Sequence, residues 1–287
     1  MLKKFKIYYR LTKPGIIRGN LMTLVAGFLF ASTTWVDWHK LGWALLGTGL
    51  IIASSCVLNN YIDQDIDALM SRTKKRALVR GTVSNAAALT YASILGAAGF
   101  AVLTLFTNRL TTLIGAGGFF AYVVLYGYFK RTSIHGTLVG TISGSMSLLA
   151  GYCAVTNRFD GPAVLLFVAQ SIWQMPHFYA IGVYRRDDYK AAGIPILPVV
   201  KGIRAAKTYI FFYISAYLFS VMLFKSFGYA GWSFTVVMAA VTLFWLYISA
   251  KGFTAKDNIR WAKQVFGTSL LVLLAFSLML SLERWLP

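Results

Sequence analysis

Five of the nine acidic residues fall in two short clusters, each at the end of an apolar stretch. The first cluster holds Asp63, Asp65 and Asp67, and Asn59 precedes Asp63 by four residues. Residues four apart share one helical face, so Asn59, Asp63 and Asp67 should project together, with Asp63 and Asp67 roughly 6 Å apart along the axis. Mg²⁺ binds through one or two carboxylates plus substrate phosphates, so this face is a candidate magnesium site. Asp65 points to the opposite face, where we expect it to be solvated.

Basic residues follow the first acidic cluster directly. Carboxylates beside a basic cluster suit a metal-bridged polyphosphate, which needs both signs of charge. A polar helix end followed by a basic loop is the alternative interpretation, and the residues alone leave it open. Arg186 and Lys190 are equally compatible with a role as anchors at a membrane interface. The candidate ligands of a diphosphate are Arg72, Lys75, Arg76, Lys130, Arg131, Arg186 and Lys190.

The second acidic cluster, Asp187 and Asp188, closes a later apolar stretch that contains Trp173-Gln174-Met175-Pro176-His177. Pro176 predicts a kink and freed carbonyl groups, which are tolerated where a cavity or a neighbouring helix satisfies them. His177 lies at membrane depth, where an ionisable residue is a functional candidate by default. A packing role for His177 is the alternative.

The composition predicts the elements that must position these residues. The chain has 287 residues, 57% of them hydrophobic and only 13% charged, whereas soluble domains have about 25% charged residues. Stretches without any charge, such as Ala86–Phe106 and Ala230–Ala250, are long enough to cross a bilayer as helices. We therefore expect an all-α fold, a polytopic membrane helix bundle forming a single domain over residues 1–287. The nine expected transmembrane helices are Pro14–Ala31, Leu41–Ile62, Ala86–Phe106, Leu110–Tyr128, Ile134–Val155, Gly161–Val183, Ala206–Leu223, Ala230–Ala250 and Val265–Leu282.

The net charge of +19 is distributed in short clusters between apolar spans, which argues against a nucleic-acid-binding protein. With nine spans, all but five of the 28 Lys and Arg residues fall on one side of the membrane. The positive-inside rule then predicts a cytoplasmic N-terminus and an external C-terminus. The residues on the other side are Lys40, Arg109, Arg158, Lys225 and Arg284.

The two clusters resemble the motifs of the UbiA superfamily of intramembrane prenyltransferases, whose first motif is Asn-x-x-x-Asp-x-x-x-Asp. The similarity extends from the first span to the last, and the combination with Trp-Gln-Met-Pro-His is specific to the branch of this superfamily that farnesylates haem. The segments that carry the resemblance are Leu11-Thr12-Lys13-Pro14-Gly15, Asn59 to Asp67, Arg72-Thr73-Lys74-Lys75-Arg76, Trp173 to His177, and Asp188-Tyr189.

The resemblance implies a reaction in which haem B, farnesyl diphosphate and water give haem O and diphosphate. It also implies that Asn59, Asp63 and Asp67 hold Mg²⁺. Members of the superfamily that prenylate quinone precursors carry an additional Asp near the position of His177. This chain has only the later acidic pair, Asp187 and Asp188, so the sequence leaves open whether Asp188 binds a second Mg²⁺.

The same resemblance implies a bacterial cytoplasmic (inner) membrane location within the lipid bilayer, with haem A synthase or terminal oxidase subunits as candidate partners. Aromatic side chains would stabilise a farnesyl cation by π-interaction. His177 would orient the water or contact the haem, and the sequence does not decide between these roles. The aromatic candidates are Tyr61, Trp173, Phe178 and Tyr179.

Three alternatives remain open at this point. The first is a related enzyme acting on a quinone precursor or another tetrapyrrole. The second is a membrane transporter, because intramembrane polar residues and proline-interrupted helices also mark transport paths. The third is a haem-binding assembly factor, which would leave the magnesium site unexplained.

Overall fold

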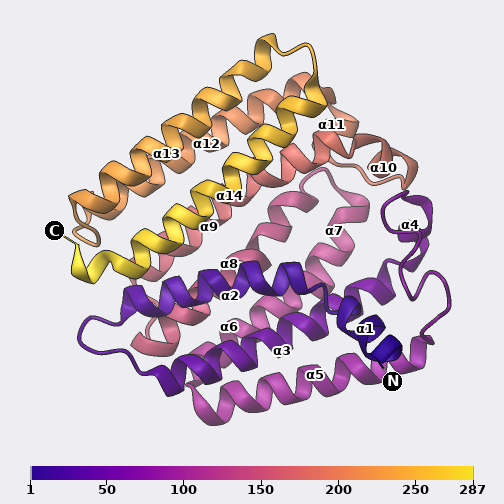
Figure 1. The fold of residues 1–287 in the computed structure, drawn as a ribbon, viewed down its shortest axis with the longest axis horizontal. Helices are drawn as coiled ribbons and strands as arrows, with labels where there is room; N and C mark the ends of the chain where they lie inside the picture. Colours follow the sequence, from indigo (N-terminus) through magenta and orange to yellow (C-terminus); the bar gives the residue numbers. More distant parts are fainter. Residues whose placement is uncertain (1, 287) are drawn as a thin grey trace.

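The structure is a computed structural model that describes the backbone of residues 2–286 and the side chains of residues 5–286. Within that range every regular element is a helix and no strand occurs. Figure 1 shows long helices running side by side in one bundle, with shorter helices gathered at the end where α4, α10 and α11 lie. The expected all-α membrane bundle is confirmed.

Eight helical segments of the described chain are long and apolar enough to cross a membrane. The remaining expected span, Gly161–Val183, corresponds to α9 (Gly161–Tyr184), a helix of 24 residues that packs against α8, α12 and α14. The chain is therefore a polytopic membrane protein. The other long elements are α2 (Pro14–Ala31), α3 (Trp38–Ile62), α5 (Asn85–Phe106), α6 (Arg109–Phe120), continued by η1 (Ala121–Tyr126) and α7 (Gly127–Thr132), α8 (Gly136–Thr156), α12 (Gly202–Ser226), α13 (Trp232–Ala250), followed by η2 (Lys251–Thr254), and α14 (Asn258–Leu282), followed by η3 (Glu283–Trp285).

Small residues let neighbouring helices approach closely, as expected for a bundle in lipid. A Cβ atom on Gly27 of α2 would overlap the carbonyl of Leu148 in α8, and one on Gly151 of α8 would overlap the carbonyl of Leu24. Contacts between α2 and α14 bring the first and last spans together. Five of the six largest fully buried aromatic side chains lie on α12, α13 and α14, which form the main apolar core with α9: Tyr217, Phe224, Phe234, Trp245 and Phe276.

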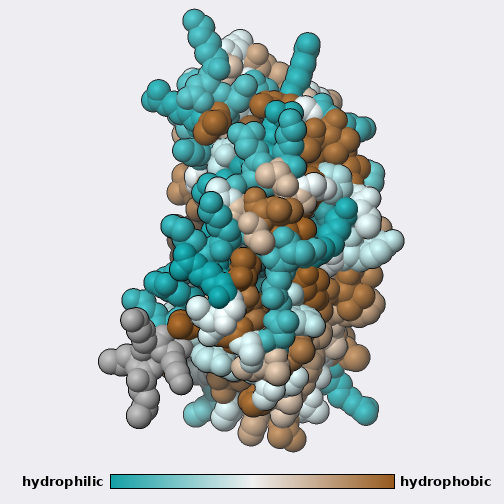
Figure 2. Space-filling model, turned by 90° about the vertical axis from the view of Figure 1, so that its right-hand side faces the viewer, coloured by the Kyte–Doolittle hydropathy of each residue, from teal (hydrophilic) through white to brown (hydrophobic). Residues whose placement is uncertain are grey.

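Four short helices lie at one end of the bundle (Figure 1): α1 (Leu2–Leu11), α4 (Gln64–Leu69), α10 (Arg186–Ala191) and α11 (Leu197–Val200). Figure 2 looks onto this end, where hydrophilic side chains gather among scattered apolar ones. A small apolar cluster ties α4 to the segment after α10, with Ile66 and Met70 packed on Ala192 and Ile194. Both acidic clusters therefore reach the same end of the bundle.

The fourth expected span contains a local irregularity. The six residues of η1 form a π-helical turn between α6 and α7. π-Helical turns are rare and occur frequently at functional sites. This one leads directly into α7, which carries Lys130 and Arg131.

Candidate active site

Asn59, Asp63 and Asp67 form one buried face where α3 ends and α4 begins. Asn59, Asp63 and Asp67 are only 4%, 5% and 1% exposed, respectively. Asp63 is the last flanking residue of α3 and the first of α4. The helical hydrogen bonds continue through this junction, from Asp63 N to Asn59 O (3.0 Å) and from Asp67 N to Asp63 O (2.8 Å). The spacing of four therefore keeps the three side chains together, as the sequence predicts.

Two cations from α7 neutralise the middle carboxylate. Lys130 Nζ donates to Asp63 Oδ2, and both side chains are less than a tenth exposed. Arg131 Nη2 lies 3.4 Å from Asp63 Oδ1 and also donates to the carbonyl of Ile62 at 2.6 Å. Asp63 thus couples α3 to α7 across the bundle.

Asp65 lies outside the buried face, with a side chain 64% exposed, as expected from its helical position. It is also ion-paired, because Arg131 donates to both of its carboxylate oxygens at 2.6 and 2.7 Å. These hydrogen bonds from Arg131 lower the pKa of Asp65 to about 2. The side chain is therefore both exposed and paired, and it orients Arg131 at the edge of the site.

The two outer members of the face meet cations from other segments. Arg76 Nη1 donates to Asp67 Oδ2, and Thr73 Oγ1 donates to the carbonyl of Asp67 at 2.9 Å. Lys13 Nζ donates to Asn59 Oδ1 at 2.5 Å. Lys13 is half-buried just before α2, and burial lowers the pKa of Lys13 to about 8. Four cations therefore surround a face that carries two buried carboxylates.

The second acidic cluster contacts the loop that follows the first. Asp188 Oδ1 accepts hydrogen bonds from Ser71 N (2.9 Å) and Ser71 Oγ (2.6 Å). These hydrogen bonds, together with the nearby charges of Arg185 and Arg72, lower the pKa of Asp188 below its ordinary value. No group of three or more His, Cys, Asp or Glu side chains suited to a metal occurs within the described residues. Asp188 is thus not part of the Asn59–Asp63–Asp67 face in this structure.

His177 is held by α14. Its Nδ1 atom lies 2.7 Å from Ser269 Oγ, and Trp173 Nε1 donates to the carbonyl of Ser269 at 3.0 Å. The imidazole stacks on Trp173, with ring centroids 4.9 Å apart, and packs against Phe266 at 4.8 Å. Its Nε2 atom has no hydrogen-bond partner among the described residues, so only the Nδ1 side of the ring is held by a hydrogen bond.

α9 also carries a polar network around Gln174, three residues before His177. The Gln174 amide donates to Thr141 O (3.1 Å), Ser145 Oγ (3.0 Å) and Gln170 O (3.1 Å). A Cβ atom on Gly144 would overlap the Gln174 amide. α9 also continues unbroken through Pro176. The network therefore ties α9 to α8.

Two of the four aromatic candidates lie beside His177 and two lie elsewhere. Trp173 and Phe178 contact the imidazole, Phe178 with ring centroids 5.3 Å apart. Tyr179 packs instead on α12, against Tyr213. Tyr61 packs against the apolar cluster between α1 and α5. The sequence could not distinguish these positions, because each aromatic residue lies within two residues of a motif residue.

The basic candidates also separate into two groups. Arg76, Lys130 and Arg131 contact the acidic face, as described above. Arg186 donates its Nε–H to the carbonyl of Pro198 at 2.9 Å and thereby ties α10 to α11. Arg72, Lys75 and Lys190 are exposed at the same end of the bundle.

Three residues at the site are not among the candidates predicted from the sequence. Lys13 belongs to the segment Leu11-Thr12-Lys13-Pro14 that carries the resemblance, and a lysine at the start of an apolar span was the available signal. Tyr126, on η1, lies under Lys130, whose Nζ atom is 5.2 Å from the ring centroid. Tyr122 stacks on Tyr126 with centroids 5.7 Å apart. No sequence signal marked the π-helical turn that presents these rings.

The structure is a polytopic helical bundle with a buried Asn-Asp-Asp face surrounded by cations, an arrangement suited to an anionic, metal-binding group. Residues 20–278 match the model of the UbiA prenyltransferase family. The chain belongs to this family, and it is a prenyltransferase.

Among its relatives, a protein of Klebsiella pneumoniae subsp. pneumoniae named "Protoheme IX farnesyltransferase" is 47% identical over 284 residues, covering 99% of this chain and 96% of the relative. A Shigella flexneri protein of the same name is 46% identical with the same coverage. The resemblance seen in the motifs therefore extends over nearly the whole chain.

Solved structures share the fold. A digeranylgeranylglyceryl phosphate synthase superposes with a TM-score of 0.80 at 19% identity, covering 98% of this chain and 99% of that one. A UbiA homologue from Archaeoglobus fulgidus bound to GPP and Mg²⁺ has a TM-score of 0.72 at 17% identity, covering 96% of this chain and 99% of that one. At these identities the likeness concerns the arrangement of helices.

Proposed function

We propose that this chain transfers the farnesyl group of farnesyl diphosphate to a vinyl group of haem B, with addition of water, to give haem O and diphosphate. The observation that carries the proposal is the 47% identity, over 99% of the chain, to a protein named for farnesyl transfer to protohaem IX. In the reaction the C–O bond to diphosphate breaks and a new C–C bond forms at the vinyl group. Water adds its hydroxyl to the adjacent carbon and releases a proton.

The buried face suits a magnesium ion. Asn59, Asp63 and Asp67 offer only oxygen ligands, the type that Mg²⁺ prefers, and two carboxylates plus substrate phosphates match its usual sites. When bound there, Mg²⁺ would neutralise charge that develops on the diphosphate leaving group. Asp188 stays a predicted ligand of a second ion, and its Oδ2 atom is the carboxylate oxygen that does not bond to Ser71.

The four cations around this face would bind the diphosphate oxygens. Lys13, Arg76 and Lys130 each donate to a member of the face, and Arg131 lies at its edge. Long basic side chains can turn from a carboxylate to a phosphate without a change in the backbone, and charge-assisted hydrogen bonds to phosphate are strong. These donors would hold the leaving group while negative charge builds on it.

The aromatic residues beside His177 and Lys130 would contact the farnesyl chain and the porphyrin. Trp173, Tyr126 and Phe178 present ring faces that stabilise a carbocation by π-interaction. His177, fixed through Nδ1 on Ser269, offers its free Nε2 to the haem. We place the role of His177 on the haem side of the reaction rather than at the diphosphate, because its neighbours are aromatic rings and Ser269.

We also propose that the protein lies in the cytoplasmic membrane of a bacterium, with the N-terminus in the cytoplasm. The support is the concentration of Lys and Arg residues at the end of the bundle that holds α1, α4, α10 and α11, since such residues are retained on the cytoplasmic side. Labelling of single cysteines placed at exposed Lys6 and Arg158 in intact cells and in opened membranes tests this orientation. Protection of position 6 and reactivity of position 158 in intact cells is the expected result.

The reaction is tested by incubating the purified protein with haem B, farnesyl diphosphate and Mg²⁺, followed by mass analysis of the extracted haem. We expect a haem product whose mass has increased by one farnesyl group and one hydroxyl group, and no product after chelation of divalent ions. Unchanged haem, together with prenylation of an aromatic acid offered as acceptor, would move the enzyme to the quinone branch of the family.

A further inference from the structure

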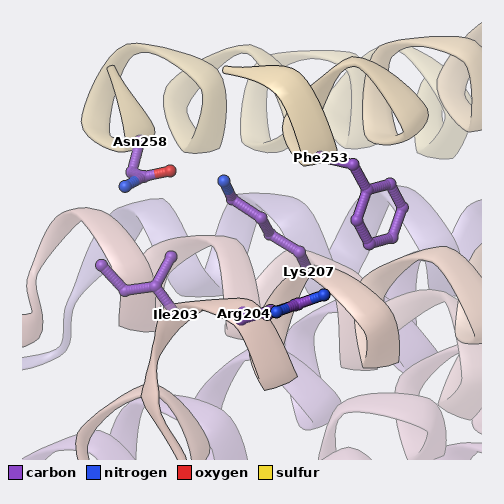
Figure 3. Close-up of a pocket in the computed structure, with 5 residues that line it drawn as sticks. All are labelled: Ile203, Arg204, Lys207, Phe253 and Asn258. Atoms are coloured by element: carbon purple, nitrogen blue, oxygen red, sulfur yellow. The ribbon is translucent and has the colours of Figure 1, made fainter. Parts of the chain in front are cut away.

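A pocket that contains two basic side chains lies on α12 and α14, apart from the residues of the acidic face. It has a volume of about 440 Å³ and is lined by Ile203, Arg204 and Lys207 of α12, Phe253 of η2 and Asn258 of α14. Figure 3 shows the Lys207 side chain extending between Asn258 and Phe253, with Arg204 along α12. None of these residues takes part in the proposed transfer reaction.

The pocket contains polar groups without protein partners. Lys207 is only 8% exposed, and its Nζ atom has neither an acidic partner nor a hydrogen bond among the described residues. Its one charge-stabilising neighbour is the ring of Trp261, whose centroid is 5.5 Å away. The Lys207 ammonium group lines the pocket without a counter-charge, and Arg204 adds a second positive charge, so the pocket suits an anion.

The surrounding sequence strengthens this preference. The single acidic residue in segments 201–207 and 251–263 is Asp257. Its carboxylate caps α14 by accepting hydrogen bonds from the backbone N–H groups of Ile259 and Arg260. All other charged residues there are basic: Lys201, Arg204, Lys207, Lys251, Lys256, Arg260 and Lys263.

Below the pocket the same surface is apolar. Phe211 lies one helical turn beyond Lys207 on α12, roughly 6 Å deeper along the axis, and packs on Phe253 with ring centroids 6.1 Å apart. Phe253 and Phe212 are themselves 51% and 66% exposed. A polar pocket above exposed aromatic rings matches an amphipathic ligand with an anionic head and an apolar tail.

We propose that this pocket binds the phosphate group of an anionic phospholipid, with Arg204 and Lys207 as its cationic ligands and the acyl chains along Phe211, Phe212 and Phe253. Basic pockets between transmembrane helices on the cytoplasmic side are suited to such headgroups. The exposed aromatic strip favours a lipid over a soluble phosphate, because a soluble anion would make no use of it. The site would tie the η2 turn to α12 at the membrane surface.

The proposal is tested by native mass spectrometry of the full-length protein in detergent, titrated with phosphatidylglycerol or phosphatidylcholine. Arg204→Gln and Lys207→Gln are compared with Lys256→Gln, which removes one exposed charge nearby but does not line the pocket. We expect phosphatidylglycerol to bind more tightly than phosphatidylcholine, and each pocket variant to lose about tenfold in affinity for phosphatidylglycerol, as for loss of a hydrogen bond to a charged group. Lys256→Gln should stay within about twofold.

Thermal denaturation of the same variants provides a second measurement that does not depend on activity. Phosphatidylglycerol should raise the Tm of the wild type and of Lys256→Gln, and should raise that of Arg204→Gln much less. Because Arg204 is exposed, this variant should fold even if Lys207→Gln does not. Equal effects of the two lipids, equal responses of pocket and control variants, or equal stabilisation by inorganic phosphate without lipid would each overturn the proposal.

Discussion

Ser71 donates both its backbone N–H and its hydroxyl to one carboxylate oxygen of Asp188, a residue 117 positions later in the chain. The contact joins the loop after α4 to α10. That loop carries Arg72 and Arg76, and Arg76 reaches back to Asp67. The two acidic motifs are therefore coupled through a serine, and Asp188 acts as a positioning residue for the basic loop in this arrangement.

Ser71→Ala tests this coupling. Loss of the hydroxyl contact should loosen the loop and weaken binding of the prenyl diphosphate, so KM for this substrate should rise about tenfold while kcat changes little. Hydrogen exchange of residues 70–84 should accelerate in the same variant. Asp187→Asn is the matched control, because Asp187 is exposed and should leave both measurements unchanged. An unaltered KM in Ser71→Ala, with loss of magnesium dependence in Asp188→Asn, would instead identify Asp188 as a metal ligand.

Substitutions at Asp63 and Asp65 separate the buried face from the exposed one. Asp63→Ala should lower kcat by at least about 100-fold, because it removes a ligand at the place where leaving-group charge develops. Asp65→Ala removes an exposed carboxylate whose partner is Arg131, so its effect should remain within a few fold. Both variants are compared by the yield of farnesylated haem at equal amounts of folded protein. An essential Asp65 beside a dispensable Asp63 would contradict the helical-face assignment.

The ion pair between Lys130 and Asp63 predicts a coupled effect on stability. Lys130→Met leaves a buried carboxylate without its main partner and should lower the free energy of unfolding by about 3 kcal/mol. The double variant Lys130→Met/Asp63→Asn removes both charges and should recover a large part of that loss. Thermal denaturation in detergent measures the cycle. Additive effects of the two single substitutions would mean that the pair does not form.

Lys13→Met tests the cation that the motifs did not reveal. Its ammonium group lies on Asn59, so its removal should raise KM for farnesyl diphosphate about tenfold or more, while haem binding stays unchanged. Lys6→Met provides the control, because Lys6 is an exposed lysine on α1 of equal charge. A similar change in both variants would indicate a general attraction of the basic surface for anions.

Gly136→Ala probes how closely α8 approaches α7. An added Cβ atom would lie 2.6 Å from Lys130 Cα and 2.8 Å from Phe129 O, so α7 would have to move. We expect a loss of activity of about tenfold or more from displaced cationic ligands. Gly127→Ala is the control, since a Cβ atom there meets nothing within 4 Å. Equal activity of the two variants would show that the position of Lys130 is not critical.

The transmembrane helices and the acidic face could be predicted from the sequence because both depend on local patterns. Apolar length alone marks the spans, and a spacing of four marks Asn59, Asp63 and Asp67. α14 begins at Asn258, well before the expected Val265, because an amphipathic first turn with Arg260 and Lys263 does not resemble a membrane span. The short helices α4, α10 and α11 have too few residues to produce a periodic signal.

The partners of the acidic face were harder to predict, because they depend on contacts between distant segments. Lys130 contacts Asp63 from α7, and Lys13 contacts Asn59 from the turn before α2. Neither contact can be read from the spacing of residues along the chain. The aromatic candidates show the same difficulty. Trp173 and Tyr179 lie on one helix, but only the rotation of α9 against α12 and α14 decides that Trp173 meets His177 and that Tyr179 meets Tyr213.

The π-helical turn η1 makes the position of Lys130 depend on the number of residues between α6 and α7. A π-helical turn accommodates one residue more than an α-helical turn, so deleting one residue between Ala121 and Tyr126 would let the helix become regular with little rotation of α7 against α6. Deleting one residue from the regular part of α6 would instead rotate every residue of α7 by about 100°, and Lys130 would no longer face Asp63. Substitution scanning would not separate these two cases, whereas single-residue deletions along 109–126 would.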